Sequence, residues 1–318
     1  MKAVAFEKFG SADELIVEDR AVPDPAPNEV LIKTCAISVN PVDVKTRQGG
    51  ALASMLMESL PLILGWDVSG VVVACGDSVK RFQSGDEVFG MIRFPNVPNG
   101  YAEYVVAPEG HLVAKPNAVT HQEAAATTLA ALTAWQAFTH FGKLKQNDRV
   151  LIHAASGGVG HFAVQIAKYL GAYVIGTSSA KNREFVLACG ADEHLDYRDA
   201  DFTKQLKGID FSLETQGGEH FERTVKVMRE GGTIINLPSG LGESARTAAE
   251  SKSLTVNYFM SVFPSSQHMQ QIASLLSSGD IKPHISKTFR LDAAGDAHRE
   301  IETGRTRGKI ILETAACC

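Results

Sequence analysis

The stretch VLIHAASGGVG, residues 150–160, combines an apolar strand, a glycine turn and the start of a helix. It joins a strand predicted at Arg149–Ala155 to an amphipathic helix predicted at Val159–Leu170. Its core, A-x-x-G-x-x-G, is a variant of the glycine fingerprint found in dinucleotide-binding βαβ units. The strand before the turn and the helix after it supply the context that this fingerprint requires.

The two outer glycines of this turn have different predicted tasks. Gly157 would let the backbone approach a pyrophosphate without a Cβ in the way, and Gly160 would let the helix pack close to the strand. The helix N-terminus then presents free amides to the phosphates. The stretch therefore predicts a dinucleotide site, with a tight turn in an unrelated doubly wound domain as the alternative.

The chain after this turn alternates between strand and helix. Further strands are predicted at Ala172–Ser178, Glu193–Tyr197, Ile209–Glu214 and Thr233–Leu237, with helices at Asn182–Ala188, Phe202–Lys207 and Phe221–Met228. Such alternation predicts parallel strands joined by crossover helices, which is a Rossmann-type doubly wound α/β sheet.

The first third of the chain has a different pattern. Short β-rich runs are separated by Gly, Pro and Asn turn signals, which favours a compact barrel-like domain. Thr120 and Glu123 form a predicted capping box, and apolar residues from Ala124 to Phe141 predict one helix that ends at Gly142.

Composition limits the function classes. The chain has 318 residues, a formal net charge of −5 and 44% hydrophobic residues, which is typical of a soluble protein with two domains. It has no basic cluster for nucleic acid and no apolar run long enough for a membrane span, so neither partner is expected. The apolar run at the N-terminus is too short for a signal-peptide core, so we expect a cytoplasmic protein.

The five cysteines predict no disulfide framework or zinc-finger spacing. Only Cys317 and Cys318 are neighbours, and a lipidation signal there is a minor alternative. A catalytic zinc usually has three Cys, His or carboxylate ligands. Cys35 stands alone, the histidines show no paired spacing, and Asp43 and Asp67 are the only acids near the expected ligand segments. The sequence therefore predicts no metal.

The end of the second predicted strand favours NADPH over NADH. An NAD site usually has an acidic residue about 20 residues after the glycines. Here the first acid after the turn is Glu184, inside the next predicted helix, whereas Ser178, Lys181 and Arg183 offer a hydroxyl and two cations. These groups suit a 2′-phosphate that no carboxylate repels. A solvated helix face is the alternative for the two cations.

Several segments together resemble the medium-chain dehydrogenase/reductase superfamily, in its zinc-independent quinone oxidoreductase-like branch. The matching segments are SVNPVD at 38–43, GWDVSG at 65–70, the spaced V-x-x-F-x-x-G-D-x-V-x-G at 79–90, AASGGVG at 154–160, GAD at 190–192, DY at 196–197 and GKIIL at 308–312. The resemblance covers essentially the whole chain, and the four-cysteine lobe that binds structural zinc in other branches is absent from the sequence.

The resemblance implies a fold of two domains. A GroES-like β-barrel catalytic domain would comprise residues 1–122 and be completed by 282–318. A Rossmann NADP-binding domain would comprise residues 123–281. The family often forms homodimers by joining Rossmann sheets edge to edge, so a homodimer is expected.

The resemblance also implies cofactor contacts. It assigns the pyrophosphate to Ser156, Gly157, Gly158, Val159 and Gly160, and the 2′-phosphate to Ser178, Lys181 and Tyr197. It assigns the ribose and nicotinamide to Gln216, Leu237, Pro238, Ser239 and Gly240, with Tyr258, Phe259 and Met260 closing over the nicotinamide. Alternatively, Tyr197 is a strand-surface aromatic, and Phe259 and Phe263 belong to the core or an interface.

Two residues of the first domain match positions near the nicotinamide and the substrate. Asn40 and Lys45 are the predicted catalytic residues, and Lys45 is also expected to contact the cofactor. Some relatives have Tyr at the Lys45 position. The alternatives are that Asn40 caps a turn before Pro41 and that Lys45 is a solvated cation.

The expected reaction follows from the expected lack of a Lewis acid. Zinc polarises a carbonyl in related alcohol dehydrogenases, so a metal-free enzyme needs an acceptor that is already electrophilic. We expect NADPH to pass hydride to a quinone or a conjugated enone or enal, with Asn40, Lys45 or a ribose hydroxyl stabilising the charge on oxygen. The alternatives are an enoyl-thioester reductase of the same superfamily and a non-catalytic NADPH-binding redox sensor.

Overall fold

The computed structural model describes residues 1–198 and 201–315. The chain divides into two compact units. The first unit contains residues 1–132 together with the chain from Phe263 onward, and the second unit contains Thr133–Val262. Among the described residues, no helix has the length and hydropathy that a bilayer crossing requires.

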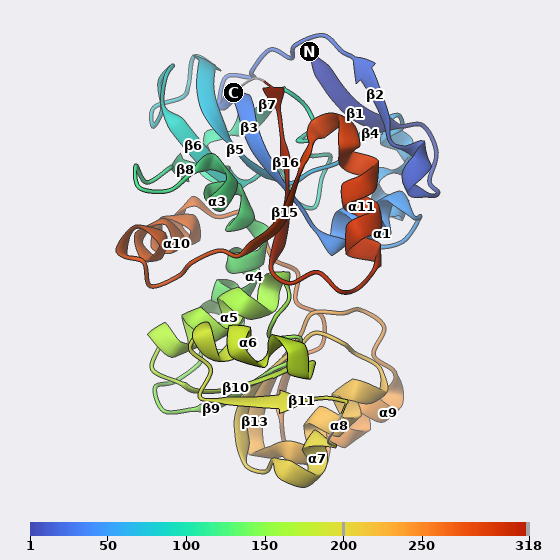
Figure 1. Cartoon of the computed structure of the whole chain (residues 1–318), viewed down its shortest axis with the longest axis vertical. Helices are drawn as coiled ribbons and strands as arrows, with labels where there is room; N and C mark the ends of the chain where they lie inside the picture. The colour runs from blue at the N-terminus through green and yellow to red at the C-terminus, as the bar shows by residue number, and fades with distance from the viewer. Residues whose placement is uncertain (199–200, 316–318) are drawn as a thin grey trace. The chain divides into compact units, whose positions relative to one another are not determined.

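A six-stranded parallel sheet forms the centre of the second unit (Figure 1). Its strands are β9 (Arg149–Ile152), β10 (Tyr173–Ser178), β11 (Glu193–Asp196), β12 (Ile209–Glu214), β13 (Met228–Asn236) and β14 (Thr255–Asn257). The spatial order is β11-β10-β9-β12-β13-β14, which is the doubly wound order 3-2-1-4-5-6. The predicted Rossmann-type fold is therefore confirmed.

Helices cover both faces of this sheet. They are α5 (Gly158–Tyr169), α6 (Arg183–Ala188), α7 (Phe202–Gln205), α8 (Glu219–Val227) and α9 (Glu243–Glu250). Figure 1 shows α5 and α6 on one side and α8 on the other. Val150, Leu151 and Ile152 of β9 are fully buried, which explains why this central strand is a continuous apolar run in the sequence.

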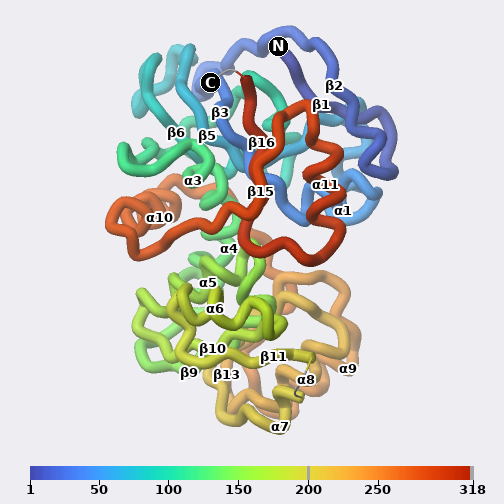
Figure 2. Tube along the Cα trace, viewed as in Figure 1, coloured from blue at the N-terminus to red at the C-terminus, as the bar shows by residue number. Residues whose placement is uncertain are grey.

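The first unit is built from two mostly antiparallel sheets. β1 (Lys2–Phe6), β2 (Ile16–Asp19) and β4 (Leu62–Ile63) form the smaller sheet. The larger sheet has the order β15-β16-β3-β5-β6-β8, with β7 (Tyr104–Pro108) also paired to β3. Its other strands are β3 (Glu29–Val39), β5 (Asp67–Cys75), β6 (Glu87–Met91), β8 (Val113–Ala114), β15 (Ile285–Arg290) and β16 (Lys309–Glu313). Figure 2 shows β16 beside β3, although more than half of the chain separates them in sequence.

The helices of the first unit explain why its limits differ from those expected at residues 122 and 282. The helices are α1 (Pro41–Arg47), α2 (Ala53–Leu56), α3 (His121–Ala126), α10 (Ser266–Ser278) and α11 (Ala294–Glu302), whereas α4 (Leu129–Gln136) contains the boundary between the two units. α3 packs on β3, β5 and β16, where its buried Ala125 and Ala126 meet Ala36 and Ile311. α10 packs on β8. Because α3 and α10 bury their apolar faces on the first unit, the structural boundaries fall after residue 132 and after residue 262.

The predicted capping box at Thr120 is present, since its hydroxyl accepts a hydrogen bond from Glu123 N at 3.2 Å. The single helix predicted from Ala124 to Phe141 is wrong. Thr127 and Thr128 separate α3 from α4, and their hydroxyls donate to the carbonyls of Glu123 and Ala125. Such local hydrogen bonds compete with the regular helical ladder.

A buried polar network joins three strands of the first unit. The Lys309 ammonium donates to the Asn40 carboxamide oxygen, and Asn40 Nδ2 donates to Asp67 Oδ2 at 2.8 Å. Asp67 Oδ1 in turn accepts from the backbone N of Leu129 at 2.9 Å, at the start of α4. Asp43 accepts from the backbone N of Asn40 at 2.7 Å. The three segments 38–43, 65–70 and 308–312, on which the family resemblance rests, therefore meet in one network.

Burial sets the ionisation of this network. Burial raises the pKa of Asp43 to about 7, and the charge of nearby Asp67 adds to that rise. Burial also raises the pKa of Asp67 and lowers that of Lys309, whereas the attraction between Asp67 and Lys309 opposes both shifts. The Lys309 ammonium is thus the cation that compensates the two buried carboxyl groups.

We predict that Lys309→Met lowers the free energy of unfolding by about 3 kcal/mol, because it leaves buried carboxyl groups without their cation. Urea unfolding of the full chain measures the change. The matched control is Lys287→Met, which removes a lysine whose ion pair with Glu300 lies at the surface and whose loss should cost less than about 1 kcal/mol. Equal losses in the two variants would contradict the proposed role of the buried ammonium.

Candidate functional site

The glycine turn lies between β9 and α5 of the second unit. β9 ends at Ile152, and Ala154 takes a positive φ of 48° that reverses the chain. The amide of Gly157 donates to the Ala154 carbonyl at 2.8 Å, which closes the turn. Gly157 is the N-cap of α5 and has no side chain to cap it. The first-turn amides of α5 therefore lack partners in the helix and suit an anion such as a pyrophosphate.

Gly160 is required by the close approach of α5 to this turn. A Cβ at Gly160 would lie 2.1 Å from the Ala154 carbonyl oxygen and 2.8 Å from Ala155 Cα. A Cβ at Gly157 would lie 3.2 Å from the Ala154 oxygen, which is a much milder conflict. The packing role predicted for Gly160 agrees with this geometry, and the turn has the shape that a dinucleotide needs.

The structure brings together the three residues predicted to hold the 2′-phosphate. Ser178 ends β10, and its carbonyl accepts a hydrogen bond from the backbone N of Tyr197, just after β11, at 3.4 Å. Lys181 is exposed in the 3₁₀ turn Ala180–Asn182, and Tyr197 is 51% exposed. Ser178 itself is only 2% exposed, and its hydroxyl lies 2.8 Å from His194 Nε2. The Ser178 hydroxyl is therefore engaged within the fold, and its predicted contact with a 2′-phosphate stays a prediction.

The expectation that no carboxylate lies near this corner is also wrong. Asp196 pairs with Ser178 in the parallel register of β10 and β11. Its carboxylate accepts hydrogen bonds from the backbone N of Ala180 at 2.7 Å and of Arg198 at 2.9 Å. The sequence does not reveal this contact, because Ser178 and Asp196 are 18 residues apart and become neighbours only through the register of the two strands. Arg198, which lies over the Tyr197 ring at 5.6 Å, is a further cation that the sequence analysis did not include.

Asn236, which the sequence analysis missed, organises the segments predicted for the nicotinamide. Its Nδ2 donates to the carbonyls of Pro238 at 2.5 Å and Tyr258 at 3.0 Å. The backbone carbonyl of Asn236 accepts a hydrogen bond from the backbone N of Met260 at 2.9 Å. Leu237 is also anchored, by a hydrogen bond from its N to the Glu214 carbonyl at 2.9 Å. The loops after β13 and β14 are thereby held together, as their shared predicted role requires.

The side chains in the loops after β12, β13 and β14 differ in how exposed they are and so in whether they can contact a cofactor. The Tyr258 ring packs against the core of the second unit and lies under the Arg246 guanidinium at 4.4 Å, and its predicted contact with the nicotinamide stays a prediction. Met260 is 5% exposed, whereas Phe259 is 58% exposed. Gln216, Ser239 and Gly240 are exposed residues that follow β12 and β13.

The two predicted catalytic residues lie in the first unit and differ sharply in exposure. Asn40 is 1% exposed and is the N-cap of α1. Its amide hydrogens are directed to Asp67 and to the Ser38 carbonyl, and its oxygen accepts from Lys309. All groups of this carboxamide are engaged within the protein, which fits a positioning residue, and the predicted catalytic role of Asn40 stays a prediction. Lys45 is exposed on α1, and within the described residues its ammonium has no hydrogen bond or ion pair.

A polar cluster beside the glycine turn was also missed. His153, which follows β9, is fully buried, and burial lowers its pKa to about 4. Glu214, at the end of β12, accepts hydrogen bonds from the amides of Gln216 at 2.7 Å and Gly217 at 3.2 Å. Burial would raise the pKa of Glu214, but the hydrogen bond from His220 and the nearby histidines lower it to about 2. The signal in the sequence is weak because the three residues are far apart.

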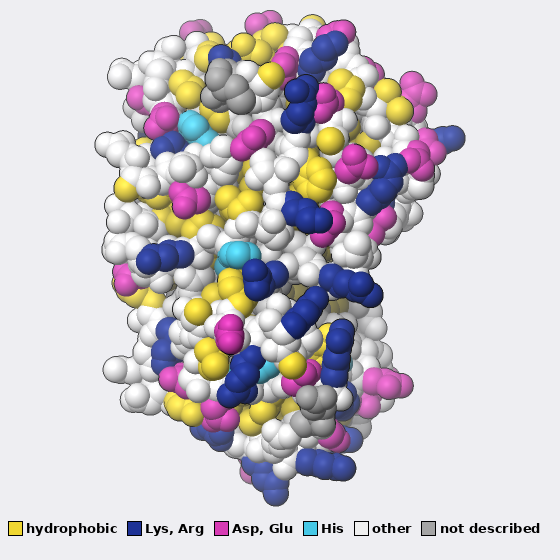
Figure 3. Space-filling view, viewed as in Figure 1, with side chains coloured by type: hydrophobic (Ala, Val, Ile, Leu, Met, Phe, Trp, Pro, Cys, Tyr) yellow, Lys and Arg dark blue, Asp and Glu magenta, His cyan; other side chains and the backbone are white. Residues whose placement is uncertain are grey.

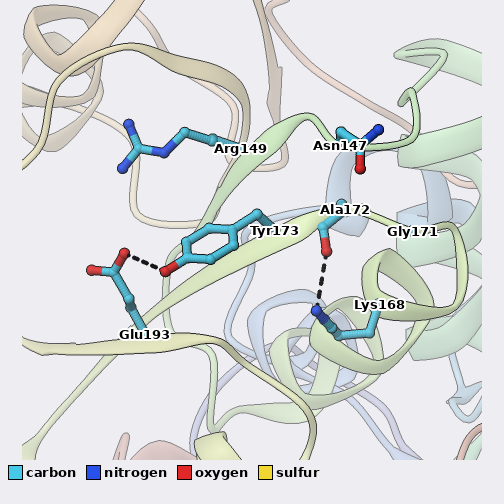
Figure 4. A pocket seen from close by; sticks show the side chains of 7 residues that line it. All are labelled: Asn147, Arg149, Lys168, Gly171, Ala172, Tyr173 and Glu193. Atoms are coloured by element: carbon cyan, nitrogen blue, oxygen red, sulfur yellow. Dashed lines mark hydrogen bonds between the residues drawn. The ribbon is translucent and has the colours of Figure 1, made fainter.

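A separate pocket of about 550 Å³ lies at the amino ends of β9 and β10 (Figure 4). Its charged and polar groups are engaged with one another. Tyr173 donates to Glu193 at 2.8 Å, and Lys168 bonds the Ala172 carbonyl at 3.3 Å and pairs with Asp192. Dinucleotides bind at the carboxyl ends of such sheets. This pocket is therefore not the candidate cofactor site.

We predict that Gly160→Ala weakens NADPH binding at least about tenfold and lowers the free energy of unfolding by about 1–3 kcal/mol, since the new methyl forces α5 away from the turn. The matched control is Gly242→Ala in the same unit, where a Cβ would meet nothing within 4 Å. Fluorescence titration with NADPH and urea unfolding measure the two effects. Unchanged NADPH affinity in Gly160→Ala would remove this turn from the cofactor site.

Comparisons with known proteins support the two-unit architecture. The alcohol dehydrogenase GroES-like domain family matches residues 26–117, and a zinc-binding dehydrogenase family matches residues 189–312. The chloroplastic quinone-oxidoreductase homolog of Spinacia oleracea is 36% identical over 98% of this chain and 98% of its own length.

Two solved structures extend this likeness to three dimensions. The quinone oxidoreductase of Coxiella burnetii is 35% identical with a TM-score of 0.93, over 98% of this chain and 99% of its own. The Escherichia coli quinone oxidoreductase complexed with NADPH is 27% identical with a TM-score of 0.89, over 98% of this chain and 100% of its own. The described chain, with its GroES-like first unit and its doubly wound second unit, therefore belongs to the quinone oxidoreductase-like proteins of the medium-chain dehydrogenase/reductase superfamily, which are oxidoreductases with a nicotinamide cofactor.

Proposed function

We propose that this oxidoreductase uses NADPH to reduce quinones or α,β-unsaturated carbonyl compounds by hydride transfer, without a catalytic metal ion. The observation that carries the proposal is the turn at Ala154–Gly160, where free amides at the start of α5 face outward from a site that only glycine permits. That geometry holds a pyrophosphate, and the family relationship makes a nicotinamide dinucleotide its natural occupant.

The preference for NADPH is supported by the cations at the adenosine corner. Lys181, Arg183 and Arg198 are exposed there. Asp196, an acid beside them, already accepts two backbone hydrogen bonds, so part of its charge is offset. Cations and amides of this kind suit a 2′-phosphate better than they suit a bare ribose hydroxyl. The E. coli neighbour was solved with NADPH, which fits the same preference.

The donor set of the first unit supports chemistry without a catalytic zinc. Asp43 and Asp67 are both committed to the buried network with Asn40 and Lys309. Among the described residues, the first unit contains no group of three His, Cys, Asp or Glu side chains spaced to share an ion. A zinc ion usually needs three such ligands. We therefore assign carbonyl polarisation to the acceptor's own conjugation and to side chains of the chain.

The roles of the residues follow from their exposure and charge. When bound, NADPH supplies the hydride. The α5 amides hold its phosphates, and Lys181 with Tyr197 lies where the adenosine phosphate would be held. Lys45 has an exposed and unpaired ammonium among the described groups, so it suits an oxygen that gains negative charge and has a proton to give it. A conjugated acceptor can be reduced with this hydrogen-bond and proton donor alone, without a Lewis acid.

The charge pattern of the surface fits a small, neutral acceptor. On the face drawn in Figure 3, Lys and Arg side chains are interspersed with Asp and Glu side chains. A mixed surface of this kind gives no broad basic field to steer a polyanionic or carrier-bound substrate. We also propose a homodimer, because β14 ends the parallel sheet of the second unit and leaves one strand edge available for pairing.

We predict that the protein oxidises NADPH with 1,4-quinones and conjugated enals as acceptors, and that turnover with NADH is at least about tenfold less efficient. Saturated ketones of similar size should be poor acceptors, since the described part of the first unit has no metal-ligand cluster to hold a Lewis acid. Absorbance at about 340 nm, the band of the reduced nicotinamide, follows the reaction. Efficient reduction of saturated ketones, or a preference for NADH, would contradict the proposal.

We predict that Lys45→Ala lowers kcat/KM for quinones about 100-fold while NADPH affinity changes little, because the variant loses a group that stabilises charge on the acceptor oxygen. Lys45→Arg should recover much of the activity, since it retains the charge. Lys80→Ala, at another exposed lysine of the same unit, is the control and should resemble the wild type. Steady-state kinetics measure kcat/KM for the quinone, and NADPH titration measures the affinity for the cofactor. Wild-type kinetics in Lys45→Ala would exclude Lys45 from the mechanism.

A further inference from the structure

Three potential metal ligands converge at the carboxyl ends of β9 and β12, where the strand order of the second sheet reverses direction. Glu214 Oε2 lies 3.6 Å from His153 Nε2 and 3.0 Å from His220 Nδ1. The ligand atoms of all three residues lie within 4.8 Å of one another. In a tetrahedral site with bonds near 2.0–2.1 Å, ligand atoms stand about 3.3 Å apart. The two distances from Glu214 Oε2 are close to that value, and the third pair lies within 4.8 Å.

The groups around these ligands also fit a metal site. His153 Nδ1 lies 3.1 Å from the Thr177 hydroxyl, which fixes the ring and leaves Nε2 facing Glu214. The second oxygen of Glu214 is held by the amides of Gln216 and Gly217. Protein metal ligands are usually oriented by outer hydrogen bonds of this kind. The cluster thus has two ligands already fixed in direction.

Access and charge are suitable as well. The His153 and Glu214 side chains are 1% and 0% exposed, whereas the His220 side chain is 21% exposed and offers a route for an ion. Glu214 supplies a buried negative charge. The Arg223 guanidinium, whose charge acts on His153, is paired with Asp201 at 3.0 Å, so it does not compete for Glu214.

We propose that His153 Nε2, Glu214 Oε2 and His220 Nδ1 form a binding site for one divalent transition-metal ion, with water as the fourth ligand. Two imidazoles and one carboxylate favour Zn²⁺, Co²⁺ or Ni²⁺ over Mg²⁺ and Ca²⁺, which prefer all-oxygen sites. The ion would displace the Thr224 hydroxyl, which lies 2.8 Å from Glu214 Oε2 and 3.0 Å from His153 Nε2. The site lies wholly in the second unit, is not part of the proposed hydride transfer, and departs from the sequence prediction of no metal.

The ion would act on the fold and on no reacting atom. It would join the residue after β9, the end of β12 and the first turn of α8. An ion that binds only the folded protein stabilises it by RT ln(1 + [ion]/Kd), so the melting temperature rises with the logarithm of the ion concentration once that concentration exceeds Kd. The expected consequence is therefore a metal-dependent gain in stability that does not require turnover.

Titration of the full-length, metal-stripped protein with Co²⁺ tests the site. We expect one equivalent to give the visible d–d absorption of a four-coordinate cobalt ion with nitrogen and oxygen ligands, together with a rise in Tm. His220→Ala and Glu214→Gln should lose the absorption and the rise in Tm. Thr177→Val should bind Co²⁺ about tenfold more weakly, as expected for loss of a residue that orients a ligand.

His140→Ala is the matched control, because His140 is an exposed histidine of the same unit outside the cluster, and it should bind like the wild type. His220→Ala changes the most exposed ligand, so it serves even if Glu214→Gln fails to fold. Absence of a specific cobalt spectrum in the wild type would overturn the proposal. An unchanged spectrum in His220→Ala would overturn it too, since the ion would then be bound elsewhere. Quinone reduction with NADPH is a separate assay, so either result leaves the proposed function independently testable.

Discussion

The second unit depends on the distance between α5 and the turn that precedes it. At Gly160 there is no room for a Cβ, because the Ala154 carbonyl oxygen occupies the space where one would lie. This contact sets how deeply the helix N-terminus reaches into the end of the sheet, and so where its free amides point. The positive φ of Ala154 and the neighbouring buried polar cluster are arranged around the same turn.

The first unit depends on a different interaction, the burial of one ammonium with two carboxyl groups and one carboxamide. Such a cluster is costly to desolvate and is stable only when each group has a partner. Its members come from the start of α1, from β5 and from β16. The network holds α1 at the end of β3, and α1 is the helix that presents Lys45 to solvent. Asn40 thus contributes through position and Lys45 through charge.

The sequence predicted the elements of the second unit well, because strand and helix periods alternate there and the glycine turn has a distinct spacing. β12 at Ile209–Glu214 has the predicted limits, whereas α9 and β14 were missed because short polar segments carry little periodic signal. For the candidate site, the sequence predicted which residues take part but not which groups they contact. The contacts of Asn40, Ser178 and Tyr258 within the fold were not predicted, because hydrogen bonding and burial depend on partners distant in the sequence. Asp196, Asn236 and His220 were overlooked for the same reason.

The network around Lys309 has a consequence for how the chain matures on the ribosome. The lysine lies in the last strand, whereas the groups that it neutralises are made more than two hundred residues earlier. Until that strand emerges, Asp43 and Asp67 have no buried cation and the first sheet lacks the partner of β3. The second unit is synthesised between the two segments of the first unit, so all six strands of its sheet have been made before β16. We therefore expect the nascent chain to complete its second unit before its first one, with the N-terminal segment remaining open until β16 emerges.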